Sequence, residues 1–195
     1  MNATPKPTLP AFLMVAVAPM CWAGNIVLAK GVAELIPPVS LAFWRWMVAF
    51  LVLLPLTWPY VKRDWKTALA GWKILGLLAL FGVTIFNTLL YTAMHTTTAI
   101  NGALIQTTMP AVIIVISLIL YGERVSRIQA AGVVLCVIGA GVVVLKGRWQ
   151  ALIDLALAQG DLLMIVAVVL YALYSALLPK RPNMHPMSFL TYTFG

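Results

Sequence analysis

The sequence contains few charged residues. Only 9% of its 195 residues are Asp, Glu, Lys or Arg, whereas 63% are hydrophobic. Soluble domains average about 25% charged and about 45–50% apolar residues. So few charges cannot form a water-exposed surface, and this excludes an ordinary soluble domain.

Acidic residues and cysteines are also scarce. The five acids lie outside the long apolar runs, and the two cysteines, Cys21 and Cys136, match no metal or redox spacing. An enzyme working inside a membrane would need paired carboxylates, a nucleophile beside a base, or a set of metal ligands at membrane depth. We therefore expect no enzymatic activity, no metal site and no cofactor, and we interpret both cysteines as packing residues.

The positive charge does not indicate a nucleic-acid partner. The net charge is +8, but the 13 basic residues form short clusters between apolar runs instead of one basic face or tail. Such clusters are typical of loops between membrane helices. The lipid bilayer is therefore the expected surrounding, and nucleic acid is excluded.

Long apolar runs predict an all-α, polytopic membrane helix bundle. A membrane-crossing helix needs about 20 apolar residues, and continuous apolar runs exclude the alternating strands of a barrel. Short links between the runs predict antiparallel neighbours. The expected spans cover residues 11–29, 39–59, 74–94, 99–122, 128–145 and 162–178, and a partial span opens at about residue 186.

The basic residues also predict the orientation. Nine of them fall on one side of the expected membrane, three fall on the other, and Arg45 lies within a span. Cytoplasmic loops carry the excess of Lys and Arg. We therefore expect a multi-pass protein of the plasma (inner) membrane with a cytoplasmic N-terminus.

The first and sixth apolar runs are similar to each other. Residues 13–18 followed by Trp22-Ala23 parallel residues 163–168 followed by Tyr171-Ala172. Span 1 would leave the cytoplasm and span 6 would enter it, so a repeated five-helix unit would be inverted, as in many transporters. This predicts a first repeat at residues 1–148 and the start of a truncated second repeat at residues 161–195.

A series of short motifs follows in a specific order. They are Trp22-Ala23-Gly24-Asn25, Pro37-Pro38 with Phe43-Trp44-Arg45-Trp46, Asn87 with Tyr91-Thr92-Ala93-Met94, Ala103-Leu104-Ile105 with Pro110, Gly122-Glu123-Arg124, and Gly160-Asp161-Leu162-Leu163. As a set they resemble the EamA-type exporters of the drug/metabolite transporter superfamily. The resemblance implies a ten-helix pseudosymmetric bundle whose central cavity exports amino acids, metabolites or drugs by a secondary mechanism.

Arg45 is the one charge well inside an expected span. A charge at the centre of a membrane helix costs about 2.5–3.5 kcal/mol on insertion scales, so such residues are functional candidates. Arg45 lies about six residues, roughly 9 Å, from the start of its helix. Its side chain could therefore snorkel to the interface or clamp the bundle, or it could contact the substrate directly.

Other polar and aromatic side chains interrupt spans 1, 3 and 4. The polar ones could join helices by hydrogen bonds, or they could line a cavity in which two aromatic rings offer flat surfaces to a substrate. The candidates besides Arg45 are Trp22, Asn25, Asn87, Tyr91, Asn101, Gln106 and Thr108.

Helix-breaking and small residues give further expectations. Pro19 and Pro110 would kink their spans, either at a gate or as static bends. Gly132, Cys136 and Ala140 recur at intervals of four and would allow close helix packing, including a homodimer seam. Asp161 would cap the sixth span or, alternatively, carry a proton.

Taken together, these features predict a membrane transporter of the drug/metabolite class. The leading expectation is a secondary exporter with a central cavity among spans 1, 3, 4 and 6 and a small-molecule substrate. The alternative is a non-transporting, half-size membrane partner or regulator.

Overall fold

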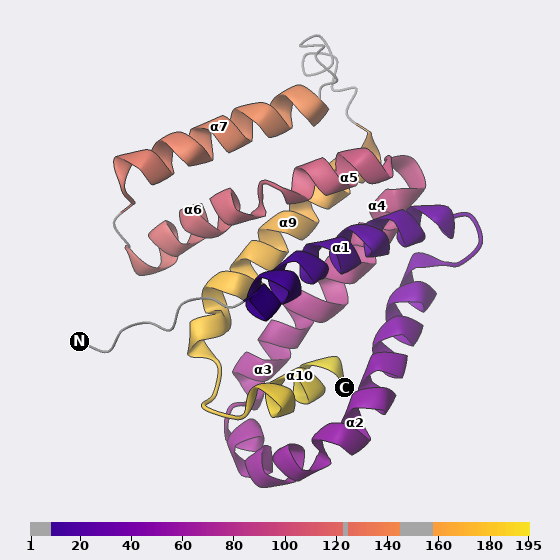
Figure 1. Ribbon diagram of the computed structural model, residues 1–195, viewed down its shortest axis with the longest axis vertical. Coiled ribbons are helices and arrows are strands. Elements are labelled where there is room, and N and C mark those ends of the chain that lie inside the picture. The colour runs from indigo at the N-terminus through magenta and orange to yellow at the C-terminus, as the bar shows by residue number, and fades with distance from the viewer. Residues whose placement is uncertain (1–8, 123–124, 145–157) are drawn as a thin grey trace.

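The computed structural model of the chain describes residues 9–122, 125–144 and 158–195, and every regular element within these ranges is a helix (Figure 1). Predictions that concern Glu123, Arg124 or residues 145–157 therefore lie outside the described residues. The expected all-α fold is confirmed.

The helices follow the apolar runs of the sequence. The elements are α1 (Leu9–Gly31), α2 (Pro38–Ala70), α3 (Trp72–Ala79), the π-helix η1 (Leu80–Ile85), α4 (Phe86–Thr96), α5 (Ala99–Gln106), α6 (Met109–Tyr121), α7 (Arg127–Val144), α9 (Gln159–Leu177), the short 3₁₀ helix η2 (Leu178–Lys180) and α10 (Pro186–Phe194).

Four helical segments in the described part of the chain are long and apolar enough to cross a membrane. They are Pro38–Ala70, Trp72–Thr96, Ala99–Tyr121 and Gln159–Lys180. Many of their large apolar side chains are exposed, as lipid contact requires. The protein is therefore an integral, multi-pass membrane helix bundle. The first and fifth expected spans are the helices α1 and α7, and their crossing of the membrane stays a prediction.

Local sequence signals explain where several helices begin and end. Pro38 occupies the first turn of α2, where its missing N–H costs nothing. Gly122 closes α6 with a φ of 64°, a left-handed conformation that favours glycine. Ser126 and Gln129 then form a reciprocal capping box, with N···O distances of 2.9 and 3.2 Å, at the start of α7.

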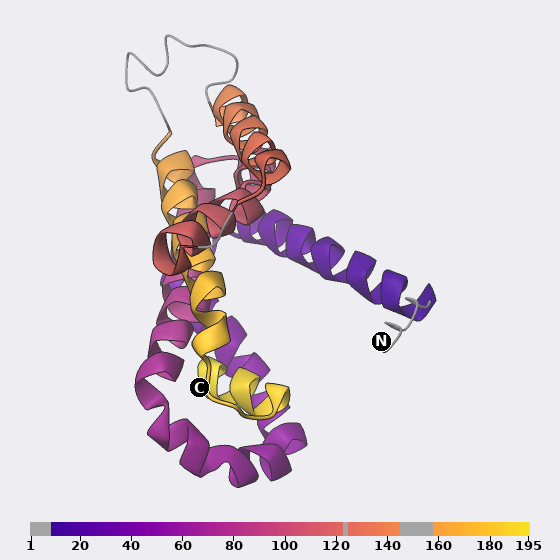
Figure 2. The same cartoon turned by 90° about the vertical axis from the view of Figure 1, so that its left-hand side faces the viewer.

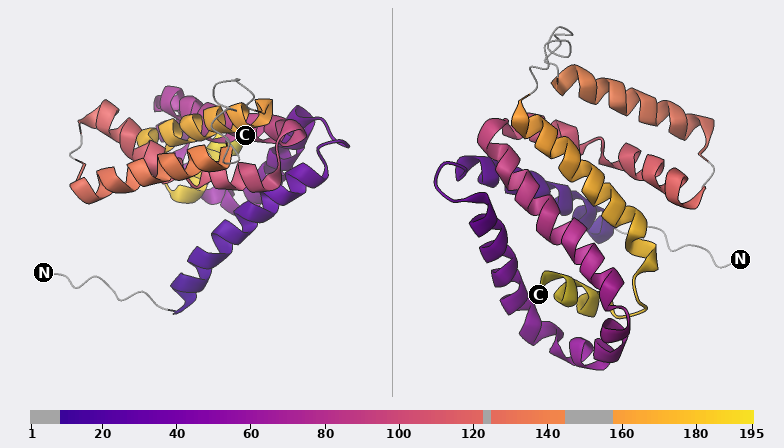
Figure 3. Two further views of the ribbon diagram at one scale, coloured as in Figure 1. Left: turned by 90° about the horizontal axis from the view of Figure 1, so that it is seen from above. Right: turned by 180° about the vertical axis from the view of Figure 1, so that it is seen from behind.

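Helices α4 and α9 form the centre of the bundle and lie side by side (Figure 3). Small residues permit this close approach, because Ala93 on α4 and Ala167 and Ala172 on α9 are completely buried. Helices α5 and α6 also pack on α9, and the second half of α1 packs on α4 and α5. The first half of α1 projects away from the other helices (Figure 2).

Helix α2 is longer than expected, because it continues to Ala70 where a loop was predicted from residue 60 onwards. Its 33 residues cover about 50 Å along a curved axis (Figure 1), whereas the hydrocarbon core is about 30 Å thick. The additional turns carry Asp64, whose carboxylate accepts hydrogen bonds from the His185 N–H and the Ser188 hydroxyl, each at 2.8 Å. The contact with α10 thus explains the extension.

Asp64 should determine how firmly α10 is held. In an Asp64→Ala variant, we expect faster hydrogen exchange of the α10 backbone amides, because the first turn of α10 loses its anionic acceptor. Arg63→Ala is the matched control, since the Arg63 side chain is 62% exposed and contacts the other oxygen of Asp64 and the Tyr60 ring, but not α10 through a hydrogen bond. Equal exchange in both variants would contradict the assignment.

Candidate functional site

The Arg45 side chain lies where α1, α2 and α4 meet. Its Nη1 group donates hydrogen bonds to Oδ1 of Asn25 on α1 and to the hydroxyl of Tyr91 on α4. The Tyr91 hydroxyl donates in turn to Asn25 Oδ1 at 3.2 Å. Arg45 is therefore held inside the bundle instead of snorkelling to the interface.

No acid neutralises Arg45 within residues 9–122, 125–144 and 158–195, because the one salt bridge in these ranges joins Arg63 to Asp64. The guanidinium instead lies beside two aromatic rings, with its Cζ atom 5.2 Å from the Trp46 ring centroid and 5.9 Å from that of Tyr91. Such cation–π contacts stabilise a cation only in part. The site therefore carries a net positive charge.

A cavity of about 450 Å³ adjoins this cluster, which we call the Arg45 cavity. Its polar lining comes from Asn25, Arg45 and Asn87. Six aromatic side chains supply most of the remaining wall, namely Trp22, Trp46, Phe86, Tyr171, Tyr174 and Phe194. A mostly apolar cavity with a few convergent polar groups is typical of small-molecule sites.

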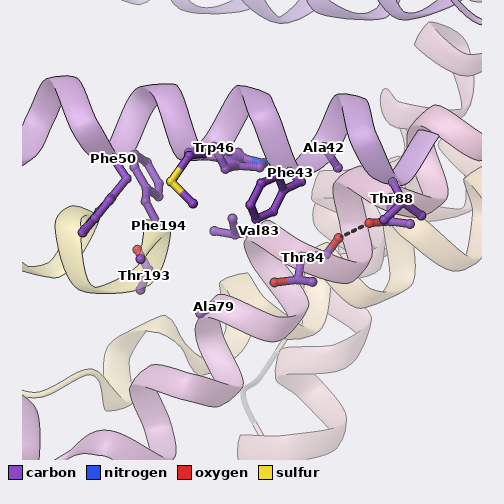
Figure 4. A pocket seen from close by; sticks show the side chains of 13 residues that line it. Ala42, Phe43, Trp46, Phe50, Ala79, Val83, Thr84, Thr88, Thr193 and Phe194 are labelled. Carbon is purple, nitrogen blue, oxygen red and sulfur yellow. Dashed lines mark hydrogen bonds between the residues drawn. The ribbon is translucent and has the colours of Figure 1, made fainter. Parts of the chain in front are cut away.

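A second hollow of about 400 Å³ lies on the other side of Trp46, between α2, the η1–α4 segment and the end of α10 (Figure 4). Phe43 and Trp46 extend from α2 toward Val83 in this view. Trp46, Val83 and Phe194 line both this hollow and the Arg45 cavity. The rings of Trp46 and Phe194, 4.5 Å apart, therefore belong to the wall that the two spaces share.

Trp22 separates the Arg45 cavity from a third hollow of about 550 Å³. Its indole N–H donates a hydrogen bond to Oε1 of Gln106 on α5. The ring also packs edge-on against Tyr171 at a centroid distance of 5.5 Å. Trp22 and Gln106 thus connect α1 to α5 and α9 beside the cavity. This arrangement agrees with a helix-joining role and with a cavity-lining role for these residues.

Not every predicted site residue lines the Arg45 cavity. The Asn101 amide donates to Asp161 Oδ2 at 3.5 Å, and the Thr108 hydroxyl, just before α6, donates to the Ile105 carbonyl at the end of α5, 2.7 Å away. Asn87 lines the cavity, but its amide donates to the carbonyl of Val83 at 2.8 Å. That carbonyl lies in the π-helix η1, and such π-helical turns occur frequently at functional sites.

The two prolines differ in their effect. Helix α1 continues through Pro19, whereas the segment that contains Pro110 breaks at residues 107–108, between α5 and α6. Both prolines line the third hollow. The break beside Pro110 is the stronger candidate for a hinge.

The prediction that Asp161 caps its helix is wrong. The N-cap position of α9 is Ala158, and no side chain caps it. Asp161 lies in the first turn of α9, where its carboxylate is 1% exposed and accepts a hydrogen bond from the Thr97 hydroxyl. This carboxylate joins α9 to the α4–α5 corner, and a role in proton transfer stays a prediction.

The expected homodimer seam lies on α7. Cys136 is exposed there, and a Cβ atom added to Gly132 would meet nothing within 4 Å. The side chain of Ala140 lies outside the described residues. Dimerisation through this face stays a prediction.

Sequence reasoning missed most of the aromatic wall. Of the six rings it selected only Trp22; Tyr91, which it also selected, bonds to Arg45 beside the cavity. The rings that it missed lie in apolar runs, where a cavity-facing ring and a lipid-facing ring look alike. No signal in the sequence separates them.

Comparison with known proteins finds one matching family and several relatives. The model of the EamA-like transporter family matches residues 9–145. The chain is 34% identical over 167 residues to an uncharacterized transporter of Archaeoglobus fulgidus and 28% identical over 170 residues to the uncharacterized transporter YyaM of Bacillus subtilis; each alignment covers 85% of this chain. It is 27% identical over 197 residues, covering 92% of this chain, to the inner membrane protein YtfF of Escherichia coli.

The alignments cover 56%, 55% and 59%, respectively, of these three relatives, so the chain spans little more than half of their length. No solved structure matches the chain.

Proposed function

Because the chain belongs to the EamA-like transporter family, we propose that it binds and moves small organic solutes as part of a secondary exporter. The solutes would pass through the Arg45 cavity. We further place the N-terminus in the cytoplasm and the protein in the plasma (inner) membrane, following the excess of basic residues on one side.

One observation carries this proposal. Asn25, Arg45 and Tyr91 come from three different helices and converge beside a cavity inside an apolar bundle. An ionised side chain in a membrane span is costly, and it typically marks a substrate or ion pathway. The aromatic walls would hold the apolar part of a solute.

Irregular helices near the cavity support the proposal that one group of helices moves during transport. The π-helix η1 contributes Gly82 and Val83 to the cavity wall, and the α5–α6 break lies beside the third hollow. Interrupted helices of this kind surround the binding sites of many transporters and allow one helix group to rock against another. Alternating access through these two points is the mechanism that we propose.

Flux and binding measurements test the function. In proteoliposomes that contain the purified chain, we expect saturable counterflow of at least one labelled solute from a panel of carboxylates, amino acids and cationic drugs. In detergent, the same solute should give saturable quenching of tryptophan fluorescence, because Trp22 and Trp46 line the cavity. Folded protein that shows neither flux nor binding for any solute would contradict the proposal.

A further inference from the structure

We propose that the Arg45 cavity selects solutes by negative charge and takes small organic carboxylates with a flat apolar body. This inference rests on the proposed function and names the class of its substrate. Three features of the cavity carry it, namely its charge, its surplus of hydrogen-bond donors and its aromatic walls.

The charge of the cavity favours an anion. Of the acids in the described ranges, Glu34 is exposed in the turn after α1, Asp64 contacts Arg63 and α10, and Asp161 contacts Thr97. None of the 14 described residues that line the Arg45 cavity is acidic. A cationic solute would thus meet Arg45 without a counter-ion, whereas a carboxylate would neutralise it.

The hydrogen-bonding groups around the cavity are mostly donors without acceptors. A guanidinium carries five N–H donors, and both side-chain hydrogen bonds of Arg45 use its Nη1 group. The Asn25 oxygen already accepts from Arg45 and Tyr91. The Nε and Nη2 donors of Arg45 have no acceptor among the described residues, whereas the unpaired indole N–H of Trp46 is fully enclosed and out of reach of a solute.

A carboxylate supplies what these donors lack. It has two oxygens that accept about four hydrogen bonds and can pair with the two arms of a guanidinium. A hydrogen bond to a charged group contributes about 1.5–3 kcal/mol, so a ligand that accepts from the unpaired donors of Arg45 gains affinity. A neutral alcohol offers one uncharged oxygen as an acceptor, and an ammonium group only donates. Either would therefore satisfy fewer of these donors than a carboxylate does.

The walls indicate the shape of the remaining part of the solute. Tyr171 packs against Trp22, Phe86 and Tyr174 at centroid distances of 5.5, 4.7 and 5.3 Å. These rings give a continuous aromatic surface on the side of α4 and α9. A planar apolar group would stack on or pack edge-on against such rings.

Three probes that share one ring and differ in charge test the inference. They are benzoate, benzyl alcohol and benzylammonium, whose binding to the purified chain in neutral detergent is measured by equilibrium dialysis. We expect benzoate to bind at least about tenfold more tightly than either of the others, since charge-assisted hydrogen bonds contribute about 1.5–3 kcal/mol. This comparison needs no variant and does not depend on how a variant folds.

Substitutions of Arg45 then assign the selectivity. We expect Arg45→Gln to weaken benzoate binding about tenfold while benzyl alcohol binding is unchanged. Arg45→Lys should retain a preference for benzoate, because the charge remains although the planar fork is lost. Circular dichroism and the thermal transition in detergent show whether each variant is folded.

The outcomes separate this inference from the proposed function. Benzylammonium binding as tightly as benzoate, or a folded Arg45→Gln variant with unchanged benzoate affinity, would overturn the anion selectivity and leave a solute-binding cavity in place. The absence of binding by all three probes would also overturn it. Saturable flux of a different solute would still support the transporter.

Discussion

Replacing Gly160 with alanine should destabilise the bundle by about 1–3 kcal/mol, and valine should do so more strongly. A Cβ atom at this position would lie 2.4 Å from the Ala93 carbonyl oxygen and 2.8 Å from the backbone nitrogen of Thr97. Both atoms belong to the backbone of the neighbouring segment, so neither can rotate away. Helix α9 would have to move off α4, the pair that forms the centre of the fold.

Thermal unfolding in detergent, followed by circular dichroism, measures this effect. Gly24→Ala is the matched control, because a Cβ atom there meets nothing within 4 Å and alanine favours the helix. We expect a lower transition temperature for Gly160→Ala and an unchanged or higher one for Gly24→Ala. The same transition temperature in both variants would mean that α4 and α9 do not pack as closely as described.

The second large effect concerns the cluster around Arg45. Replacing Asn25 with leucine removes the acceptor that serves both Arg45 and Tyr91. The partly buried Arg45 then keeps only the Tyr91 hydroxyl as a side-chain partner among the described residues, and loss of the acceptor costs about 1–3 kcal/mol. We expect Asn25→Leu to lower the thermal transition and to abolish solute flux.

A triple variant separates stability from function. This variant combines Asn25→Leu, Arg45→Met and Tyr91→Phe, so that the whole polar cluster becomes apolar. Replacement of a complete buried polar group is often neutral or stabilising. We expect the triple variant to recover the transition temperature and to remain inactive in the flux assay. A triple variant less stable than Asn25→Leu alone would identify the cluster as a structural clamp.

The positions of the helices could be predicted because the apolar runs are long and uninterrupted. Every expected run overlaps helical residues, including the one that opens at Pro186, but the run at 74–94 is divided into α3, η1 and α4 and the run at 99–122 into α5 and α6. The extension of α2 beyond residue 60 could not be predicted, because a contact between Asp64 and α10, distant in the sequence, stabilises it. The π-helix η1 likewise has no counterpart in the composition of residues 80–85.

A polar site around Arg45 could be predicted from the sequence, but the arrangement of its side chains could not. The sequence gives the depth of Arg45 in its helix, yet it does not give the direction of the side chain, which depends on how α1 and α4 pack against α2. Phe43 and Trp44 are 53% and 63% exposed, whereas Trp46 lines the cavity. Trp44 and Trp46, two positions apart, thus have different surroundings, and only the packing distinguishes them.

Asn101 shows the same limit for polar residues. Its place in an apolar run allowed either a cavity wall or a hydrogen bond between helices, and it contacts Asp161 at the α4–α5 corner. Polar side chains in membrane helices form hydrogen bonds with whichever polar group lies within reach. A nearby carboxylate is such a partner, and it comes from a helix 60 residues further along the chain.

The central claim is that one face of α1 meets water in a cavity. Cys21 lines this cavity one turn before Asn25, and Val27 lies about 200° around the helix from Asn25 and is 63% exposed. A charged methanethiosulfonate reagent modifies only thiols that water reaches, since the thiolate is the reactive form. In membrane vesicles, we compare Cys21 in a Cys136→Ser background with Val27→Cys in a background without both native cysteines. The account predicts modification of Cys21 at least about tenfold faster than of the cysteine at position 27; equal rates, or slower modification of Cys21, would contradict it.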